Sequence, residues 1–167
     1  AALATREEVI QLEGSHTIAA FILETVTGTN GILPPPPGYL EGVRALCDKY
    51  GILMIADEVM AGFGRTGRWF AVEHWGVVPD LITMAKGLTS AYLPLGAVGM
   101  RQHIGDFFRD KVFWGGLTYG NHAIACATAL ATIGGFNAIG CYVLGWMGGK
   151  LPKQYLLGSV YILRSLF

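Results

Sequence analysis

Three short apolar runs in the first half of the chain each lead to a charged residue. The runs lie at residues 17–24 (TIAAFILE), 52–56 (ILMIA) and 81–85 (LITMA). Continuous apolar stretches of this length are typical of strands that are buried in a parallel sheet. Asp57 follows the second run and Lys86 follows the third. In α/β folds reactive groups gather at the carboxyl ends of such strands, so we expect Asp57 and Lys86 to lie side by side.

Helical spacing separates these runs. In residues 39–50 the apolar side chains recur at intervals of three and four, and Gly51 follows as a helix stop. Thr5 and Glu8 have the spacing of a capping box, which predicts a helix start at Thr5. The pattern is completed by a loop over 25–38, a short helix over 71–75, a strand over 95–100 and a helix over about 121–133. The alternation of strands and helices predicts an α/β fold.

Composition narrows the classes of function. The chain has 167 residues, of which 52% are hydrophobic and 14% charged, and this excludes disorder. Its formal net charge of zero offers no basic surface for nucleic acid. Cys47, Cys126 and Cys141 lack metal-ligand spacing, as do the four histidines, so no metal site is expected. Scattered cysteines without a signal peptide favour reduced thiols and a cytoplasmic location.

The last third of the chain differs in character. All 12 acidic residues lie at or before Asp110, and the last 57 residues have no carboxylate. Between residues 112 and 149 only His122 could carry a charge near neutral pH, and an uncharged stretch of this length could span a bilayer. It is rich in Gly, Ala, Thr and Asn, which insert weakly, and a membrane span is therefore the less favoured interpretation.

Asp57 alone has several explanations. A carboxylate at the end of a buried strand can cap a loop amide. ILMIADE also resembles a Walker B strand, which would bind magnesium in an ATPase. That alternative requires a G-x-x-x-x-G-K-[ST] loop upstream, and the sequence contains none.

The GFGRTG segment over 62–67 matches the dinucleotide fingerprint G-x-G-x-x-G. A true fingerprint follows its strand directly and opens a helix, whereas here Asp57 and Glu58 intervene and no long helix follows. We therefore expect a tight turn beside a site, with Arg65 available for a carboxylate or a backbone carbonyl.

Lys86 ends a run that should be interior, and a lysine is seldom buried without a function. Desolvation would lower its pKa and free the amine for a Schiff base. The alternative is a lysine that reaches from the strand end into solvent. A lysine and an aspartate side by side are what pyridoxal phosphate (PLP) chemistry needs, since the aspartate keeps the pyridine nitrogen protonated.

With these residues assembled, the chain resembles the class III aminotransferases, a family of PLP enzymes of fold type I. The resemblance rests on AAFILETVTGTNGILPPPPGYLEGVRALCDKYGILMIADEVMAGFGRTG, on PDLITMAKGLTSAYLPLGAV and on GLTYGNHAIACATALATI, in this order. The resemblance covers about residues 17–133. Within the family, the chain is most similar to the pyruvate-dependent branch that acts on ω-amino acids and amines. It implies part of the mostly parallel, α/β/α large domain.

The resemblance also implies residue roles. Lys86 would be the catalytic lysine that holds the cofactor, and Asp57 would pair with the pyridine nitrogen. Val59 would pack on the ring. Thr118, which could otherwise be a helix N-cap, would contact the cofactor phosphate of a neighbouring subunit. Three more residues are site-adjacent candidates: Glu24, Arg65 and Met60, which stands where many relatives have Gln and cannot donate the same hydrogen bond.

The implied activity is transamination between an amino donor and a keto-acid acceptor, in a homodimer or a dimer of dimers. A PLP-dependent aminomutase is the alternative within the family, and an ATPase fragment is the alternative outside it. The family fold is far longer, and its upstream half supplies a phosphate loop and a stacking aromatic residue. We therefore expect residues 1–133 to be a partial PLP-binding domain that is inactive alone. Residues 134–167 would be a tail outside the family pattern, arising from a frameshift or a truncation.

Overall fold

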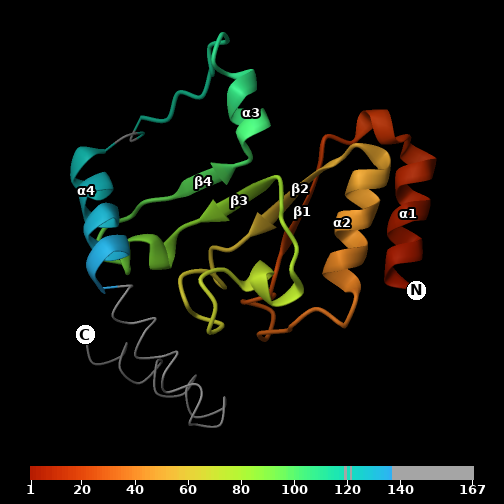
Figure 1. Cartoon of the computed structure of the whole chain (residues 1–167), viewed down its shortest axis with the longest axis horizontal. Helices are drawn as coiled ribbons and strands as arrows, with labels where there is room; N and C mark the ends of the chain where they lie inside the picture. Colours follow the sequence, from red (N-terminus) through yellow and green to blue (C-terminus); the bar gives the residue numbers. More distant parts are fainter. Residues whose placement is uncertain (119, 121, 137–167) are drawn as a thin grey trace.

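A four-stranded sheet forms the centre of the computed structural model, which describes residues 1–118, 120 and 122–136 (Figure 1). The strands, in order across the sheet, are β1 (Ala20–Glu24), β2 (Leu53–Asp57), β3 (Leu81–Met84) and β4 (Ala97–Met100). The first three run parallel, and β4 runs antiparallel to β3. The four predicted strands and the mostly parallel α/β class are confirmed.

The described helices are α1 (Ala2–Glu13), α2 (Tyr39–Tyr50), α3 (Gln102–Phe107) and α4 (Ala123–Ala131). Short turns of helix occur at η1 (Ser15–Thr17), η2 (Ala71–Trp75), η3 (Lys86–Thr89) and η4 (Thr132–Phe136). α2 matches its predicted bounds because Gly51 ends it in the left-handed conformation (φ 67°), where the Gly51 amide donates to the carbonyl of Cys47.

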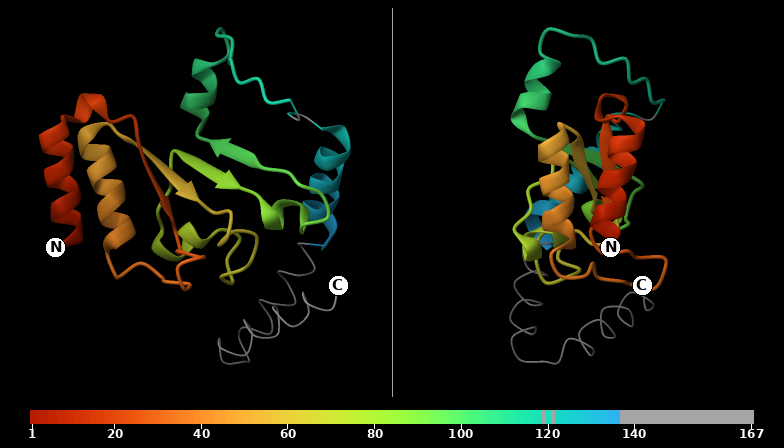
Figure 2. Two further views of the ribbon diagram at one scale, coloured as in Figure 1. Left: turned by 180° about the vertical axis from the view of Figure 1, so that it is seen from behind. Right: turned by 90° about the vertical axis from the view of Figure 1, so that its right-hand side faces the viewer.

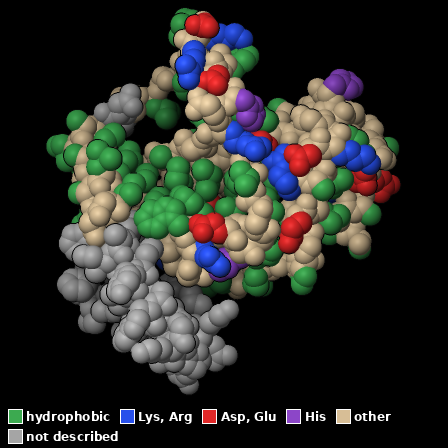
Figure 3. Space-filling view, viewed as in Figure 1, with side chains coloured by type: hydrophobic (Ala, Val, Ile, Leu, Met, Phe, Trp, Pro, Cys, Tyr) green, Lys and Arg blue, Asp and Glu red, His purple; other side chains and the backbone are tan. Residues whose placement is uncertain are grey.

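The main core lies between α2 and one face of the sheet. Leu40 and Val43 of α2 are fully buried, as is Met54 of β2, and Ile10 of α1 joins them. The apolar stripe of α2 therefore fixes which face of β2 turns inward. α1 packs beside α2, and both lie at the opposite end of the sheet from α4 (Figure 2). In Figure 3, Lys, Arg, Asp and Glu side chains lie on the α1 and α2 side and also at the top of the view around α3, whereas hydrophobic side chains gather near the middle.

Two helix starts differ from the sequence predictions. α1 begins at Ala2 rather than at Thr5, and the Thr5 hydroxyl donates to the carbonyl of Ala1 from inside the helix (3.3 Å). The capping box is wrong here because the helix pattern extends one turn further upstream. α4 is capped by His122, whose Nδ1 accepts from the amide of Ala125 (3.4 Å), so Thr118 is not the N-cap.

Within the described part of the chain, no helix has both the length and the apolar character needed to cross a membrane. Residues 137–149 of the candidate span lie outside the described residues, as does the rest of the tail to residue 167. The domain boundary at 133/134 stays a prediction.

Candidate functional site

The carboxyl ends of the three parallel strands bring the predicted site residues to one edge of the sheet. Glu24 at the end of β1 pairs in register with Asp57 at the end of β2, and Asp57 pairs with Thr83 of β3. Lys86 opens η3, two residues after β3 ends. The prediction that Asp57 and Lys86 follow adjacent strands is confirmed by the pairing of β2 with β3.

Both carboxylates at this edge hold the loop that follows their own strand. Asp57 Oδ1 accepts a hydrogen bond from the amide of Val59 (2.9 Å). Glu24 Oε2 accepts one from the amide of Gly28 (2.7 Å). The loop-capping explanation for Asp57 therefore holds in the folded chain. A carboxylate has about four lone-pair sites, so this contact does not exclude a role towards a ligand.

Lys86 is exposed, which corrects the expectation that its apolar run carries it into the interior. The strand ends at Met84, Ala85 is extended (φ −159°), and Lys86 turns the backbone with φ 44°. A positive φ at a residue other than glycine is uncommon and persists only where the surrounding structure imposes it. The turn takes the chain out of the sheet after the apolar run, so Lys86 lies outside the strand and its side chain is exposed.

Thr83 of β3 is the register partner of Asp57 and precedes Lys86 by three residues. Its hydroxyl oxygen is buried and makes no hydrogen bond to any described residue. A buried polar atom without a partner is unusual in a native fold and often marks a place where a ligand or water completes the bonding. This observation fits a polar group bound over the ends of β2 and β3.

The other candidate residues near this edge differ in burial. Val59 and Met60 lie half-buried in the loop after β2. Met60 packs on the loop after β1, since a methyl group on Gly28 would lie 2.8 Å from Met60 Cγ. Thr118 lies in an exposed turn ahead of α4, and its contact with a neighbouring subunit stays a prediction.

The GFGRTG segment folds as a compact turn, as the sequence predicts. The amides of Phe63 and Gly64 donate to the carbonyl of Trp69 (2.8 and 3.3 Å), and the amide of Gly67 donates to the carbonyl of Gly64 (3.0 Å). Only the short η2 follows, so no long helix N-terminus is available for a diphosphate. Arg65 lies half-buried in this turn.

Comparison with known proteins decides the family. The family model of aminotransferase class-III matches residues 1–138. The chain belongs to the class III aminotransferases. It is similar to an omega-aminotransferase from Caulobacter vibrioides (50% identity) and to a diaminobutyrate–2-oxoglutarate transaminase from Halomonas elongata (48%), each over 76% of this chain. Membership of this family excludes the ATPase alternative for the β2 segment.

A solved structure supports the fold. The taurine:2-oxoglutarate aminotransferase from Bifidobacterium kashiwanohense, in complex with PLP and glutamate, superimposes with a TM-score of 0.83 and 49% identity over 88% of this chain. This chain covers 33% of that one, and it covers 30% and 28% of the Caulobacter and Halomonas proteins. It therefore spans about a third of these aminotransferases.

Glu58 is a residue whose role the sequence analysis missed in this aminotransferase chain. Its carboxylate is fully buried and accepts three hydrogen bonds, from the Thr25 hydroxyl (2.9 Å) and from the amides of Ala71 (3.0 Å) and Val72 (2.9 Å). A signal existed: side chains alternate along a strand, so Glu58 continues the buried face that carries Met54 and Ala56.

Asp80 was also missed, and it lies at the opposite ends of the strands. Asp80 Oδ2 accepts from the amide of Met54 (2.8 Å) and pairs with Arg44 (2.7 Å), and Oδ1 pairs with Arg101 (3.4 Å). Burial alone would raise the pKa of Asp80. The hydrogen bond from Met54 and the ion pair with Arg44 outweigh burial, and the pKa lies below its ordinary value.

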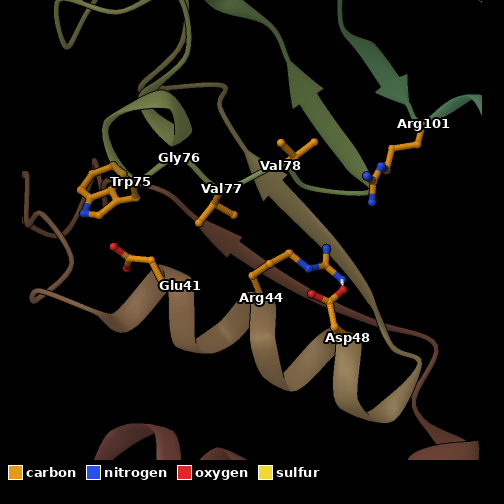
Figure 4. A pocket seen from close by; sticks show the side chains of 8 residues that line it. All are labelled: Glu41, Arg44, Asp48, Trp75, Gly76, Val77, Val78 and Arg101. Atoms are coloured by element: carbon orange, nitrogen blue, oxygen red, sulfur yellow. Dashed lines mark ion pairs between the residues drawn. The ribbon is translucent and has the colours of Figure 1, made fainter.

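These arginines border a groove of about 300 Å³ along α2 (Figure 4). Glu41 and Trp75 lie towards one end of it, and Asp48, which pairs with Arg44 at 2.8 Å, lies towards the other. The groove is separate from the edge that carries Asp57 and Lys86. Both of its arginines already pair with Asp48 or Asp80, so we assign it a structural role.

Proposed function

We propose that this chain provides the lysine and the aspartate of a PLP site in a transaminase. The observation that carries the proposal is the placement of Asp57 and Lys86 after the adjacent parallel strands β2 and β3, in a chain of the class III family. The unpartnered hydroxyl of Thr83, the register partner of Asp57 on β3, supports a polar ligand at this edge.

In this proposal each residue has a defined task. Lys86 holds the cofactor covalently and moves a proton to and from the substrate Cα. Asp57 keeps the pyridine nitrogen protonated, and Val59 packs on the ring. When bound, PLP supplies an electron sink for the carbanion that deprotonation leaves on the substrate. Glu24, Met60 and Arg65 border the site, and Thr118 contributes to the site of a second subunit.

We propose a small amino acid or amine as the donor and a keto acid as the acceptor. The relatives reported above carry transaminase names, which favours transamination over the aminomutase alternative. A dimeric assembly and a cytoplasmic location belong to the same proposal. Cys47 and Cys126 are free thiols, in keeping with a reducing compartment, and burial raises the pKa of the Cys47 thiol.

Borohydride reduction in the presence of PLP tests the site. We expect the pyridoxyl group to be found mainly on Lys86, with exposed Lys49 of α2 as the internal control, and to fall in the Asp57→Asn variant. Equal labelling of the two lysines would contradict the proposal.

Turnover is a separate measurement. We expect the 167-residue chain alone to show none with amino donors and pyruvate, because the resemblance assigns other parts of the site to segments outside it. Turnover by the chain alone would contradict that expectation while supporting the site.

A further inference from the structure

We infer that Glu58 is a positioning residue for Lys86, acting through the loop of residues 59–70. The inference rests in part on the proposed function, because Lys86 matters through its reactive amine. Its structural content is independent of any cofactor. Glu58 neither touches nor faces Lys86 directly, and the connection runs through Phe63 and Gly87.

Glu58 closes the base of the loop. Its own amide donates to the carbonyl of Thr83 in β3 (3.0 Å), and its carbonyl accepts from the amide of Gly62 (2.9 Å). Its carboxylate holds the amides of Ala71 and Val72 at the far end of the loop. One residue therefore ties the loop's start, its end and the neighbouring strand together.

The loop between these ties is a packed unit. The ring of Phe63 meets the rings of Trp69 (5.8 Å between centroids) and Phe70 (5.5 Å) edge to face. The amides of Phe63 and Gly64 donate to the Trp69 carbonyl, and these backbone bonds, which do not depend on the ring, tie Phe63 to the far end of the loop.

Phe63 carries the contact to the Lys86 turn. A methyl group on Gly87 would lie 2.7 Å from Phe63 Cβ, which is closer than real side-chain atoms approach, and 3.1 Å from its Cδ2, which is a tight contact. Phe63 therefore rests directly on the backbone that follows Lys86. Lys86 has φ 44°, and its carbonyl accepts from the amide of Ala91 (3.1 Å). A turn in this uncommon conformation needs support from outside, and the loop provides it.

Three variants of the chain test the connection, with two measurements on each. Glu58→Gln keeps the shape of the side chain but replaces one acceptor oxygen with a donor that faces an amide. Phe63→Gly removes the contact with Gly87. Phe63→Leu keeps atoms equivalent to Cβ, Cγ and Cδ2 and loses only the ring. Gly105→Ala is the matched control. A methyl group on Gly105 would lie 4.0 Å from Met100 Sδ, an ordinary contact, in a region remote from the Lys86 turn.

The first measurement is amide hydrogen exchange without PLP. In Glu58→Gln and Phe63→Gly we expect the Ala91 amide to exchange about tenfold faster, as for the loss of one net hydrogen bond. We expect wild-type rates in Gly105→Ala, and near wild-type rates in Phe63→Leu. The second measurement is the ratio of pyridoxyl label on Lys86 to that on Lys49, which should fall in the first two variants and be kept in Phe63→Leu.

The two measurements separate the two proposals. If Ala91 exchange and the labelling ratio stay at wild-type values in Glu58→Gln and Phe63→Gly, the inference is overturned, whether or not the amides of Ala71 and Val72 become exposed. Equal falls in Phe63→Leu and Phe63→Gly would also overturn it, because the ring rather than the contact would then be responsible. If the wild type shows no preference for Lys86, the proposed function fails, while Ala91 exchange still decides the inference.

Discussion

Two buried carboxylates stand at opposite ends of the same parallel strands, and they are satisfied in different ways. Asp80, at the amino ends, pairs with two arginines and one backbone amide. Glu58, at the carboxyl ends, is held by a hydroxyl and two backbone amides, all of them uncharged. Charge pairs fix the end of the sheet that lies away from the candidate site, whereas neutral donors from loops shape the end that carries it.

The difference has a physical reason. At the amino ends, the ion pairs with Arg44 and Arg101 compensate the burial of Asp80, and its hydrogen bonds with Met54 fix the alignment of the strands. The amide of Met54 donates to the Asp80 side chain, while the Asp80 amide donates to the Met54 carbonyl (2.8 Å each). At the carboxyl ends, Glu58 instead accepts from a hydroxyl in the loop after β1 and from two amides in η2, so it ties loop backbone rather than charged side chains together.

The largest expected effect comes from Glu58→Ala. It leaves one buried hydroxyl and two buried amides without an acceptor, and we expect the free energy of unfolding to fall by about 4 kcal/mol. Urea unfolding followed by circular dichroism measures this. A loss no greater than that of a surface substitution would show that water replaces the carboxylate. Glu58 would then not be what holds the carboxyl ends of the strands.

Asp80→Ala should follow, with a loss of about 3 kcal/mol in the same experiment, because it removes the partner of the mostly buried Arg44. Asp80→Asn is the matched variant: it keeps an acceptor for the Met54 amide and loses the charge alone. We expect it to lose about 2 kcal/mol, most of the loss in Asp80→Ala, because Arg44 again loses a charged partner. If Asn costs far less than Ala, the backbone bond rather than the ion pairs holds this end.

The pH dependence sharpens the contrast. The pKa of folded Asp80 lies below the ordinary value of 3.8, so its ion pairs stabilise the fold above that pH. The stabilisation is lost as the pH falls below 3.8 and through the lower pKa of the folded state. We therefore expect the difference in unfolding free energy between wild type and Asp80→Asn to shrink over that interval. A difference that stays constant to lower pH would contradict the assignment.

Arg101→Ala should have the smallest effect, about 0.5 kcal/mol or less in urea unfolding, because its side chain is 48% exposed and its distance to Asp80 is 3.4 Å. Arg44, at 2.7 Å and 16% exposure, is the matched residue, and Arg44→Ala should cost clearly more. Equal losses would mean that the two arginines share Asp80 evenly.

Much of the fold follows from the sequence because its signals are local. The aliphatic runs define β1, β2 and β3, and the stripe of α2 with its glycine stop defines that helix to the residue. The pairing of Asp57 with the strand that leads to Lys86 follows from the rule that parallel strands end at one edge. The capping box at Thr5 failed because other helix-forming residues precede it, and a local motif does not report where the helix started.

The sequence by itself determined that an aspartate and a lysine stand at the ends of two apolar, strand-forming runs of an α/β fold, since such runs and their ends are properties of short segments. Only the tertiary structure decided that Lys86 turns outward with φ 44°, that Glu58 is buried, and that Asp80 collects two arginines. Those facts depend on contacts between residues 13 to 36 positions apart. Such contacts are set by how the chain returns on itself, and no periodicity within one element encodes them.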